Sequence, residues 1–431
     1  MHKKIKLLAL IIFIANIVLP CFAAEEPESF HAKKIIVEDL SIEDALTFAI
    51  NHPSLISKRK ETLAAEQRIE TTKWLRFPSV SVQTSAGQSS VSRTGGTVIT
   101  TLRLDQPIWA GGRITNSIDS AAAKAQSATF AQIEAEQEFL IKTTTSFANF
   151  LKYQEKLDAS QESINEHQRL LEMIQRKARQ DVSPISEVIL AKSRFEQAKA
   201  ENIQFQTFFA NTKSDLENYT NRSVLNLKSP RMALVLPPNI NEAVKLALDF
   251  SPQLKKIAAD KDAAEADIGV AKSVLWPQIS ARSDQNFGGV LEGNLTYLAL
   301  TYTPGNGLAS ISGIREAEVK RDASEQIMIA VKLDLTNKIN LLWNQYKSET
   351  SQVEVLSNLA QTSRGVYLSF IRQYAAGKKT WPEVLNARKE ATNAKYQLAE
   401  SQWNAFVAGI SLGIHTGLIS SNFNSVINKA E

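Results

Sequence analysis

Residue types that catalyse reactions or bind metals are sparse in this chain and are not grouped. Of five histidines in 431 residues, His31, His52, His167 and His415 lie far apart, and the chain has one cysteine, Cys21. We find no nucleophile, base and acid at the spacings that covalent catalysis needs. The sequence therefore predicts a protein that is not an enzyme and that holds no metal ion or cofactor.

Two glycine-rich stretches lack the sequence context of a phosphate-binding loop. These are Gly111-Gly112 and the segment 305–307. His167 lies on an apolar helical face, where a packing role or a polar register role is more common than a ligand role. We therefore look for the function in the elements of the chain.

The N-terminus has the layout of a secretory signal peptide. Three lysines within the first six residues precede an apolar run over 7–19, and Ala23 and Ala24 follow. This arrangement predicts a signal peptide over residues 1–24, cleaved after Ala23 or Ala24. A membrane anchor is the alternative, although the run is short for a helix that spans a bilayer.

Cleavage would leave a mature chain with little net charge and no cysteine. The whole chain has a formal charge of +4, and the three lysines leave with the signal peptide. The lack of cysteine excludes disulfides and thiolate metal sites. Near neutrality argues against a nucleic-acid surface. No later segment has about 18 uninterrupted apolar residues, so an exported chain of this kind stays soluble in the envelope or crosses a membrane as a barrel.

The main organising feature is a long helical stretch with a seven-residue apolar repeat, and this stretch occurs twice. Its steps of four and three are typical of helices that supercoil on partners. At about 1.5 Å per residue it reaches roughly 100 Å, so it must pack lengthwise against other helices. The copies match at an offset of 196 residues: Ser146, Phe150, Tyr153, Leu157, Ser160, Ile164, His167, Leu171, Ile174 and Ala178, then Leu342, Tyr346, Glu349, Val353, Leu356, Ala360, Ser363, Tyr367, Phe370 and Tyr374.

A shorter repeat precedes each hairpin. After a mobile lead at 25–38, a short helix begins behind the N-cap Ser41, and a second helix runs over about 53–75. The same order of short helix, proline, helix and aromatic-proline pair recurs over 240–276. An order shared over about 37 residues indicates an internal duplication.

The period changes to two after each aromatic-proline pair. Apolar and polar residues alternate over 80–86 and 98–105, and a weaker pair spans 279–287 and 295–303. Strands of about 10 residues suit tilted membrane strands. A soluble hairpin packed on helices is the alternative. Aromatic residues lie at or near the strand ends: Trp74, Phe77, Trp109, Trp276, Tyr297 and Tyr302.

These patterns divide the mature chain into two similar repeats, a linker and a tail. The first repeat is 25–230, the linker 231–239, the second repeat 240–415 and the polar tail 416–431. Within the repeats we predict these elements: hairpins at 79–107 and 278–304, long helices at 113–180 and 313–376, and return helices at 185–220 and 382–414.

Two hairpins supply four strands, which is below the eight of the smallest closed membrane barrels. Open strand edges leave backbone groups without partners in lipid. If these are membrane strands, the chain must oligomerise, and three copies would supply twelve strands. The predicted fold is therefore mainly α with a membrane β-barrel, built from a tandem repeat of helix, two strands, long helix and return helix.

Two stretches resemble landmarks of a known family, the TolC-type outer-membrane channels. Residues 102–113 resemble the strand-to-helix junction of that family, and 372–387 with Gly377 resemble its second helical turn. The resemblance covers nearly all of the mature chain. It implies a homotrimer with a twelve-stranded barrel in the outer membrane and an α-helical tunnel in the periplasm.

The resemblance also implies function and partners. Residues 182–184, 191–194 and 377–383 are more similar to the branch that exports large surface adhesins. We therefore predict the exit duct of a type I secretion system, working with a periplasmic adaptor (membrane fusion) protein, an inner-membrane ABC transporter and outer-membrane lipid, and not with nucleic acid. The alternatives are the outer-membrane component of a tripartite drug efflux pump and, in a different class, a periplasmic coiled-coil scaffold.

The same resemblance implies where the closed entrance of the tunnel lies. In the family, polar residues link the helical turns (tips) of neighbouring subunits, and the equivalent residues here are Ser186 and Glu187 in the first turn and Tyr374 and Lys379 in the second. A carboxylate in the first turn of a helix also interacts well with the helix dipole, which is the simpler explanation for Glu187.

The entrance constriction falls on Glu383 and Asn386. The family carries an acidic residue at both positions, so one carboxylate here implies weaker attraction of cations. The dipole explanation applies to Glu383 as well.

Adaptor docking falls on Asp181, Val182, Gly377 and Lys378 in the tip turns. Asp181 stands where a glycine is usual in the family, which bears on the geometry of the first turn.

Overall fold

The computed structural model describes residues 36–87, 97–230, 236–288, 292–305, 307 and 309–419. All of these except Ile36 belong to one compact unit, Val37–Glu431. The predicted signal peptide 1–24 lies outside the described residues. So do most of the predicted lead and polar tail, the turn of the first hairpin and part of the linker.

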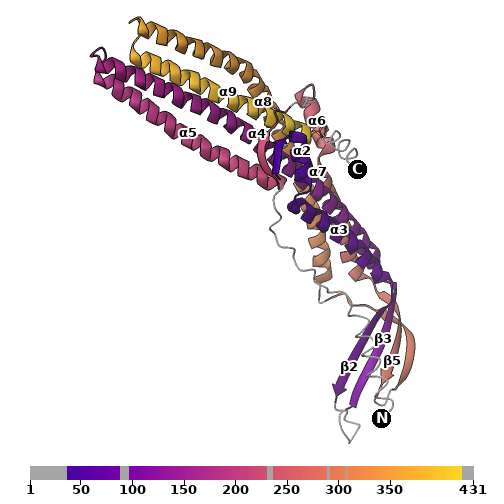
Figure 1. Ribbon diagram of the computed structural model, residues 1–431. Helices are drawn as coiled ribbons and strands as arrows, with labels where there is room; N and C mark the ends of the chain where they lie inside the picture. Colours follow the sequence, from indigo (N-terminus) through magenta and orange to yellow (C-terminus); the bar gives the residue numbers. More distant parts are fainter. Residues whose placement is uncertain are drawn as a thin grey trace. The chain divides into compact units, whose positions relative to one another are not determined.

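The described residues are mainly helical, and their elements come in two similar series (Figure 1). The first series is α2 (Ile42–Ile50), α3 (Pro53–Lys73), η1 (Trp74–Arg76), β2 (Ser79–Gly87), β3 (Thr97–Trp109), α4 (Arg113–Arg179) and α5 (Ile185–Thr220). The second is α6 (Ile240–Phe250), α7 (Pro252–Lys272), η2 (Ser273–Leu275), β5 (Gln278–Phe287), β6 (Gly293–Thr301), α8 (Ala309–Ala375) and α9 (Trp381–His415).

The two long helices have equal lengths and equivalent positions. α4 and α8 each contain 67 residues, which corresponds to roughly 100 Å. Their first residues, Arg113 and Ala309, are separated by the offset of the apolar repeat. α8 begins at Ala309, four residues before the predicted start at 313. Residues 309–312 include no proline to stop the helix, and Gly313 is accommodated inside it.

Side-chain caps explain where the shorter helices begin. Ser41 Oγ accepts a hydrogen bond from the Asp44 N–H at 3.1 Å, and Asn239 Oδ1 accepts one from the Glu242 N–H at 2.9 Å. α3 and α7 each have a proline at their first position, where the missing N–H costs nothing.

A small two-stranded sheet corrects the prediction of a mobile lead up to residue 38. β1 (Ile36–Leu40) pairs with β4 (Ser223–Leu227). Leu40 and Val224 are fully buried, and the Lys228 N–H donates to the Leu40 carbonyl at 3.0 Å. The strands come from opposite ends of the first repeat. No local turn pattern in the sequence connects them, so periodicity alone did not reveal the pairing.

The four longer strands form one antiparallel sheet in the order β2-β3-β5-β6, so β2 and β6 are its edges. One face is mainly apolar and exposed, with 65% of Val82 and 69% of Leu300 accessible. The other face is polar. Its cross-strand contacts between β3 and β5 are Arg103 to Asp284 at 2.8 Å, Arg282 to Asp105 at 2.7 Å and Thr101 to Asn286 at 2.7 Å.

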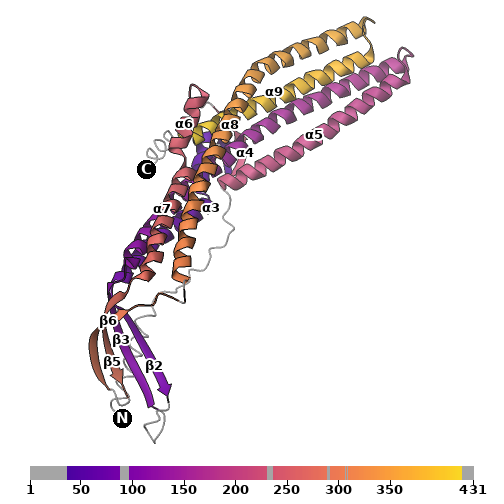
Figure 2. The ribbon, with the colours of Figure 1, turned by 180° about the vertical axis from the view of Figure 1, so that it is seen from behind.

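Each long helix changes partner along its length. α4 packs on α3 and α7 near Thr62 and Ser120, and farther along on α5 and α9 near Asn202 and Lys156. α8 does the same with α7 and then α9 (Figure 2). The turns that follow α4 and α8 therefore lie at the opposite end of these helices from the strands.

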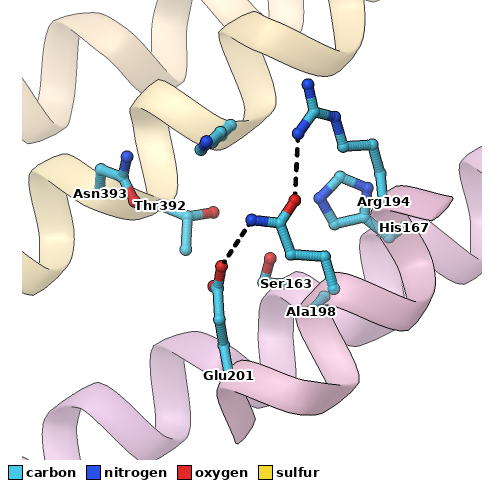
Figure 3. A pocket seen from close by; sticks show the side chains of 9 residues that line it. Ser163, His167, Arg194, Ala198, Glu201, Thr392 and Asn393 are labelled. Atoms are coloured by element: carbon cyan, nitrogen blue, oxygen red, sulfur yellow. Dashed lines mark hydrogen bonds between the residues drawn. The ribbon is translucent and has the colours of Figure 1, made fainter. Parts of the chain in front are cut away.

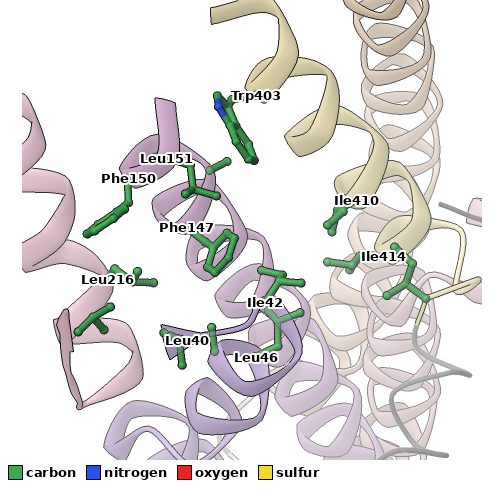
Figure 4. Packing of buried hydrophobic residues seen from close by; sticks show 14 residues of the cluster. Leu40, Ile42, Leu46, Phe147, Phe150, Leu151, Leu216, Trp403, Ile410 and Ile414 are labelled. Carbon is green, nitrogen blue, oxygen red and sulfur yellow. The ribbon is translucent and has the colours of Figure 1, made fainter. Parts of the chain in front are cut away.

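The core divides into separate clusters, one of which lies where β1, β4, α2, α4, α5 and α9 meet (Figure 4). Leu40, Phe147, Leu216 and Ile410 are fully buried there. A second cluster joins α4, α5, α8 and α9 near their turns, and a third joins α6, α8 and α9. The unit is therefore stabilised by several small hydrophobic clusters at intervals along the long helices and not by one continuous core.

α8 leaves much of its apolar surface uncovered. Leu333, Leu341 and Val355 are 61–66% exposed, while the predicted repeat positions on the neighbouring face are mostly half-buried against α9. Among the described residues, no helix combines the length and apolarity required for a bilayer crossing.

Candidate functional site

The turns after α4 and α8 have the same backbone geometry. Asp181 has a φ of 55° and Gly377 a φ of 71°. The Val182 N–H donates to the Lys177 carbonyl at 3.0 Å, and the Lys378 N–H donates to the Gln373 carbonyl at 2.8 Å. These are the bonds of a helix end closed by a left-handed residue. Asp181 therefore keeps the geometry of a glycine turn, because aspartate tolerates this conformation better than most residues.

A buried cluster holds the two turns against one another. Trp381 and Ile174 are fully buried, Tyr367 is nearly so, and the rings of Tyr374 and Trp381 lie 5.0 Å apart. Residues from α4, α5, α8 and α9 contribute to the cluster. The tip residues of the two repeats are therefore neighbours within one chain.

Tyr374 contacts Glu187 across the two turns. The Tyr374 hydroxyl donates to Glu187 Oε2 at 3.5 Å, and the Lys177 ammonium lies 4.1 Å from the centre of the Tyr374 ring. Burial raises the pKa of Tyr374, so the hydroxyl stays a donor. A distance of 3.5 Å makes this a weak bond. Ser186 is exposed and takes part in neither contact.

Lys379 bonds within its own turn rather than to the first turn. Its ammonium donates to Glu383 Oε1 at 2.7 Å, and Glu383 Oε2 accepts from the N–H and hydroxyl of Thr380, both at 2.8 Å. These bonds, that of Lys379 above all, lower the pKa of Glu383 to about 2. Glu383 is thus ionised, caps α9, and has its charge offset by Lys379.

The remaining sequence-predicted residues lie on the surface of the turns. Asp181, Val182, Gly377, Lys378 and Asn386 are all exposed. The structure therefore brings together two pairs, Tyr374 with Glu187 and Lys379 with Glu383, and leaves the others free to meet a partner.

An exposed apolar stripe at the first turn was missing from the sequence prediction. Val182, Ile185 and Ile189 are 67%, 73% and 64% exposed. Their spacing of three and four residues places the two isoleucines on one face of α5, and this spacing was visible in the sequence. The corresponding residues of the second turn are Lys378, which is exposed, and Trp381 and Leu385, which are buried, so the two tips offer different chemistry.

Cationic side chains outnumber carboxylates at the two turns. Segments 174–188 and 370–386 together hold six lysines and arginines and three carboxylates. Because Lys379 offsets Glu383, the turns present a net positive surface.

The histidines that the structure describes, His52, His167 and His415, take part in helix capping and packing. His52 Nδ1 accepts from the Ser54 N–H at 3.2 Å and caps α3. His167 lies buried between helices, and His415 is largely buried. The described residues include no group of three or more metal-ligating side chains placed to hold an ion.

Together, these features define a tandemly duplicated helical protein with an amphipathic antiparallel sheet and paired helical tips. The chain belongs to the outer membrane efflux protein family, whose profile matches residues 47–222 and 243–412. The resemblance to TolC-type channels inferred from the sequence is thereby confirmed at the level of the family. No curated protein sequence matches the chain.

Solved structures of outer-membrane proteins share the fold. VceC from Vibrio cholerae is 14% identical with a TM-score of 0.75, covering 87% of this chain and 96% of its own. A membrane protein from Pseudomonas aeruginosa is 15% identical with a TM-score of 0.74, covering 92% and 96%. The CmeC outer membrane channel from Campylobacter jejuni is 13% identical with a TM-score of 0.74, covering 87% and 86%.

Proposed function

We propose that this protein is the outer-membrane exit duct of a type I secretion system. Three copies form a twelve-stranded barrel in the outer membrane and an α-helical tunnel in the periplasm. The observation that supports this best is the sheet. Its mainly apolar face is exposed, and its edge strands β2 and β6 each pair with a strand on one side only among the described residues. Backbone groups in lipid need partners, and three such sheets joined edge to edge supply them.

The paired helical tips form the closed entrance in this proposal. Opening separates the α8–α9 pair from the α4–α5 pair, so it breaks the bond between Tyr374 and Glu187. The constriction at Glu383 and Asn386 presents three carboxylates, each beside a lysine, because Lys379 lies 2.7 Å from Glu383. Ser186 and Lys379 contribute to links between neighbouring copies.

The tip turns dock a periplasmic adaptor protein, which connects the duct to an inner-membrane ABC transporter. Val182 with Ile185 and Ile189 offers an apolar contact at the first turn, next to Asp181. Gly377 and Lys378 offer a cationic contact at the second. Exposed apolar groups beside a polar rim are typical of protein interaction surfaces.

The first test concerns assembly. We expect the detergent-purified protein to have the mass of a trimer and to form ion-conducting pores in planar bilayers. A monomer that osmotic shock releases in plain buffer and that conducts no ions would contradict the duct.

The second test separates secretion from efflux. The tip segments at 182–184 and 377–383 favour secretion of a large surface protein, whereas the family description favours a tripartite drug efflux pump. A deletion strain that retains a large protein but keeps its drug tolerance supports secretion. A strain that becomes drug-sensitive and secretes normally supports efflux.

A further inference from the structure

A small cavity lies between α4, α5 and α9, about three turns from the helical tips (Figure 3). Its volume is about 20 Å³, which suits one occupant of the size of a water molecule or a halide. Its lining includes Ser163 and His167 from α4, Arg194 and Glu201 from α5, and Lys389 and Thr392 from α9. The cavity thus lies between helices of the first repeat and a helix of the second.

Several buried polar groups lack hydrogen-bond partners among the described residues at the contact of α4, α5 and α9 around the cavity, here called the joint. They are His167 Nδ1, Arg194 Nε, Arg388 Nε and the Tyr396 hydroxyl. His167 is 5% exposed. A guanidinium Nε–H can only donate, and a phenol hydroxyl and one imidazole nitrogen also donate. Leaving buried donors unpaired is costly, so an occupant that accepts hydrogen bonds from Arg194 and His167 would lower this cost.

Positive charge at the joint is only partly offset. Arg194 Nη1 donates to Gln197 Oε1 at 3.0 Å, and Gln197 Nε2 donates to Glu201 at 3.2 Å, so an amide stands between this cation and the carboxylate (Figure 3). Arg388 lies 3.8 Å from Glu162, which also pairs with Lys395. Lys389 adds a further cation to the lining.

We infer that this cavity binds one small anion of the halide class, held by Arg194 and by His167 as its Nδ1–H tautomer. An anion only accepts hydrogen bonds, which matches the unpaired donors of the joint. A water molecule could also accept from these donors and donate to Glu201 or Ser163 in the lining, so the excess of cationic side chains is what favours an anion, and the test below distinguishes the two. The bound anion joins α4 to α5, and Lys389 of α9 lines the same cavity, so the anion also lies against the helix of the second repeat.

The direct test is crystallographic. Crystals of the full-length protein grown or soaked in sodium bromide should show an anomalous peak in the cavity beside Arg194 and His167. A refined water at this place with no anomalous signal would overturn the inference.

A solution test excludes an adventitious ion in the crystal. We expect the Tm of the detergent-purified protein to rise with chloride or bromide relative to gluconate at equal ionic strength, because gluconate is too large for the cavity. Arg194→Gln should abolish this difference. If that variant does not fold, the bromide map of the unaltered protein decides. A bromide peak without a halide effect on Tm means an adventitious ion only and also overturns the site.

His415 provides a matched control. It is also largely buried with an unpartnered ring nitrogen, Nε2, but its cavity of about 230 Å³ is lined by Glu134, Glu138 and Asp334. His415→Asn should keep the halide effect, and His167→Asn should weaken it. Equal behaviour of the two variants would contradict the assignment.

Discussion

At the scale of single residues, Asp181 holds a backbone conformation that glycine adopts more easily. A Cβ atom added to the equivalent Gly377 would have no neighbouring atom within 4 Å. The free-energy cost of a non-glycine residue at such a turn therefore comes from the left-handed backbone conformation and not from a steric clash. We expect Asp181→Gly to raise the free energy of unfolding by up to about 1 kcal/mol and Gly377→Ala to lower it by about 1 kcal/mol. Thermal unfolding of the purified variants measures both. A less stable Asp181→Gly variant would show that the aspartate side chain contributes more than its backbone costs.

The buried histidines make stability depend on pH. Burial, with Arg388 and Arg194 nearby, lowers the pKa of His167 from 6.5 to about 4, and burial with Lys338 lowers that of His415 to about 4. Between pH 6.5 and 4 the unfolded chain therefore binds more protons than the folded chain. The contribution of each histidine should fall by on the order of 3 kcal/mol as the pH drops through this window and level off below it, where protonation of carboxylates with lowered pKa values, such as Glu383, continues the loss.

Unfolding followed from pH 7 to pH 4 tests this dependence. His167→Gln should flatten the curve. His52→Gln changes an N-cap and should lower stability at all pH values, and because burial lowers the pKa of His52 as well, it should flatten the curve to a smaller extent. A curve of unchanged slope in His167→Gln would mean that His167 titrates normally in the folded protein.

At the scale of elements, the bond between the two helical turns controls the proposed entrance. Tyr374→Phe removes the donor and Glu187→Ala the acceptor of a bond of 3.5 Å, worth about 0.5–1 kcal/mol per chain. Both variants should show larger or more frequent single-channel currents than the unaltered protein in planar bilayers. Gln204→Ala, at an exposed site on α5 away from both turns, leaves the bond and the constriction intact and is the control. Currents unchanged in both variants would exclude this bond from the gate.

Lys379 sets the effective charge of the proposed constriction. Lys379→Gln leaves the Glu383 carboxylate without the cation at 2.7 Å, so three uncompensated charges face the entrance of a trimer. We expect reversal potentials in a salt gradient to shift toward cations, and the shift to shrink at high salt as screening increases. Lys60→Gln, on α3 far from both turns, makes the same change in net charge. Equal shifts of the reversal potential in both variants would show that ion selectivity depends on the net charge of the chain and not on the position of Lys379.

The sequence revealed the elements with strong periodicity and missed those without it. The seven-residue repeat, the Ser41 cap and the alternation at Val80 and Val82 were each local patterns. The pairing of β1 with β4 joins segments from opposite ends of a repeat, so no local pattern marks it. The family resemblance placed Lys379 in a link between neighbouring tips. In the structure Lys379 bonds Glu383 instead, because Glu383 lies one helical turn away and is held at the start of α9 by its bond to Thr380.

At the scale of the whole molecule, a single chain leaves much apolar surface uncovered. The outer face of the sheet includes exposed Val82 and Leu300, and α8 exposes Leu341 and Val355. In the trimeric duct that we propose, lipid covers the first surface and neighbouring copies cover the second. These surfaces could be listed from the sequence as apolar positions. The packing of the helices within one chain was needed to show which of these apolar positions remain exposed to solvent.

A substitution on α8 tests whether neighbouring copies cover that helix. Val355 is 65% exposed, so Val355→Glu should change the stability of an isolated chain by no more than about 0.5 kcal/mol. In a trimer the same change buries a carboxylate against apolar side chains, which costs several kcal/mol unless the carboxylate is paired. We expect the detergent-solubilised variant to shift from trimer to monomer in mass and to lose conductance. Lys347→Glu, at a site on α8 that already carries a charge, should remain trimeric. A trimeric, conducting Val355→Glu variant would place this face of α8 in water rather than between copies.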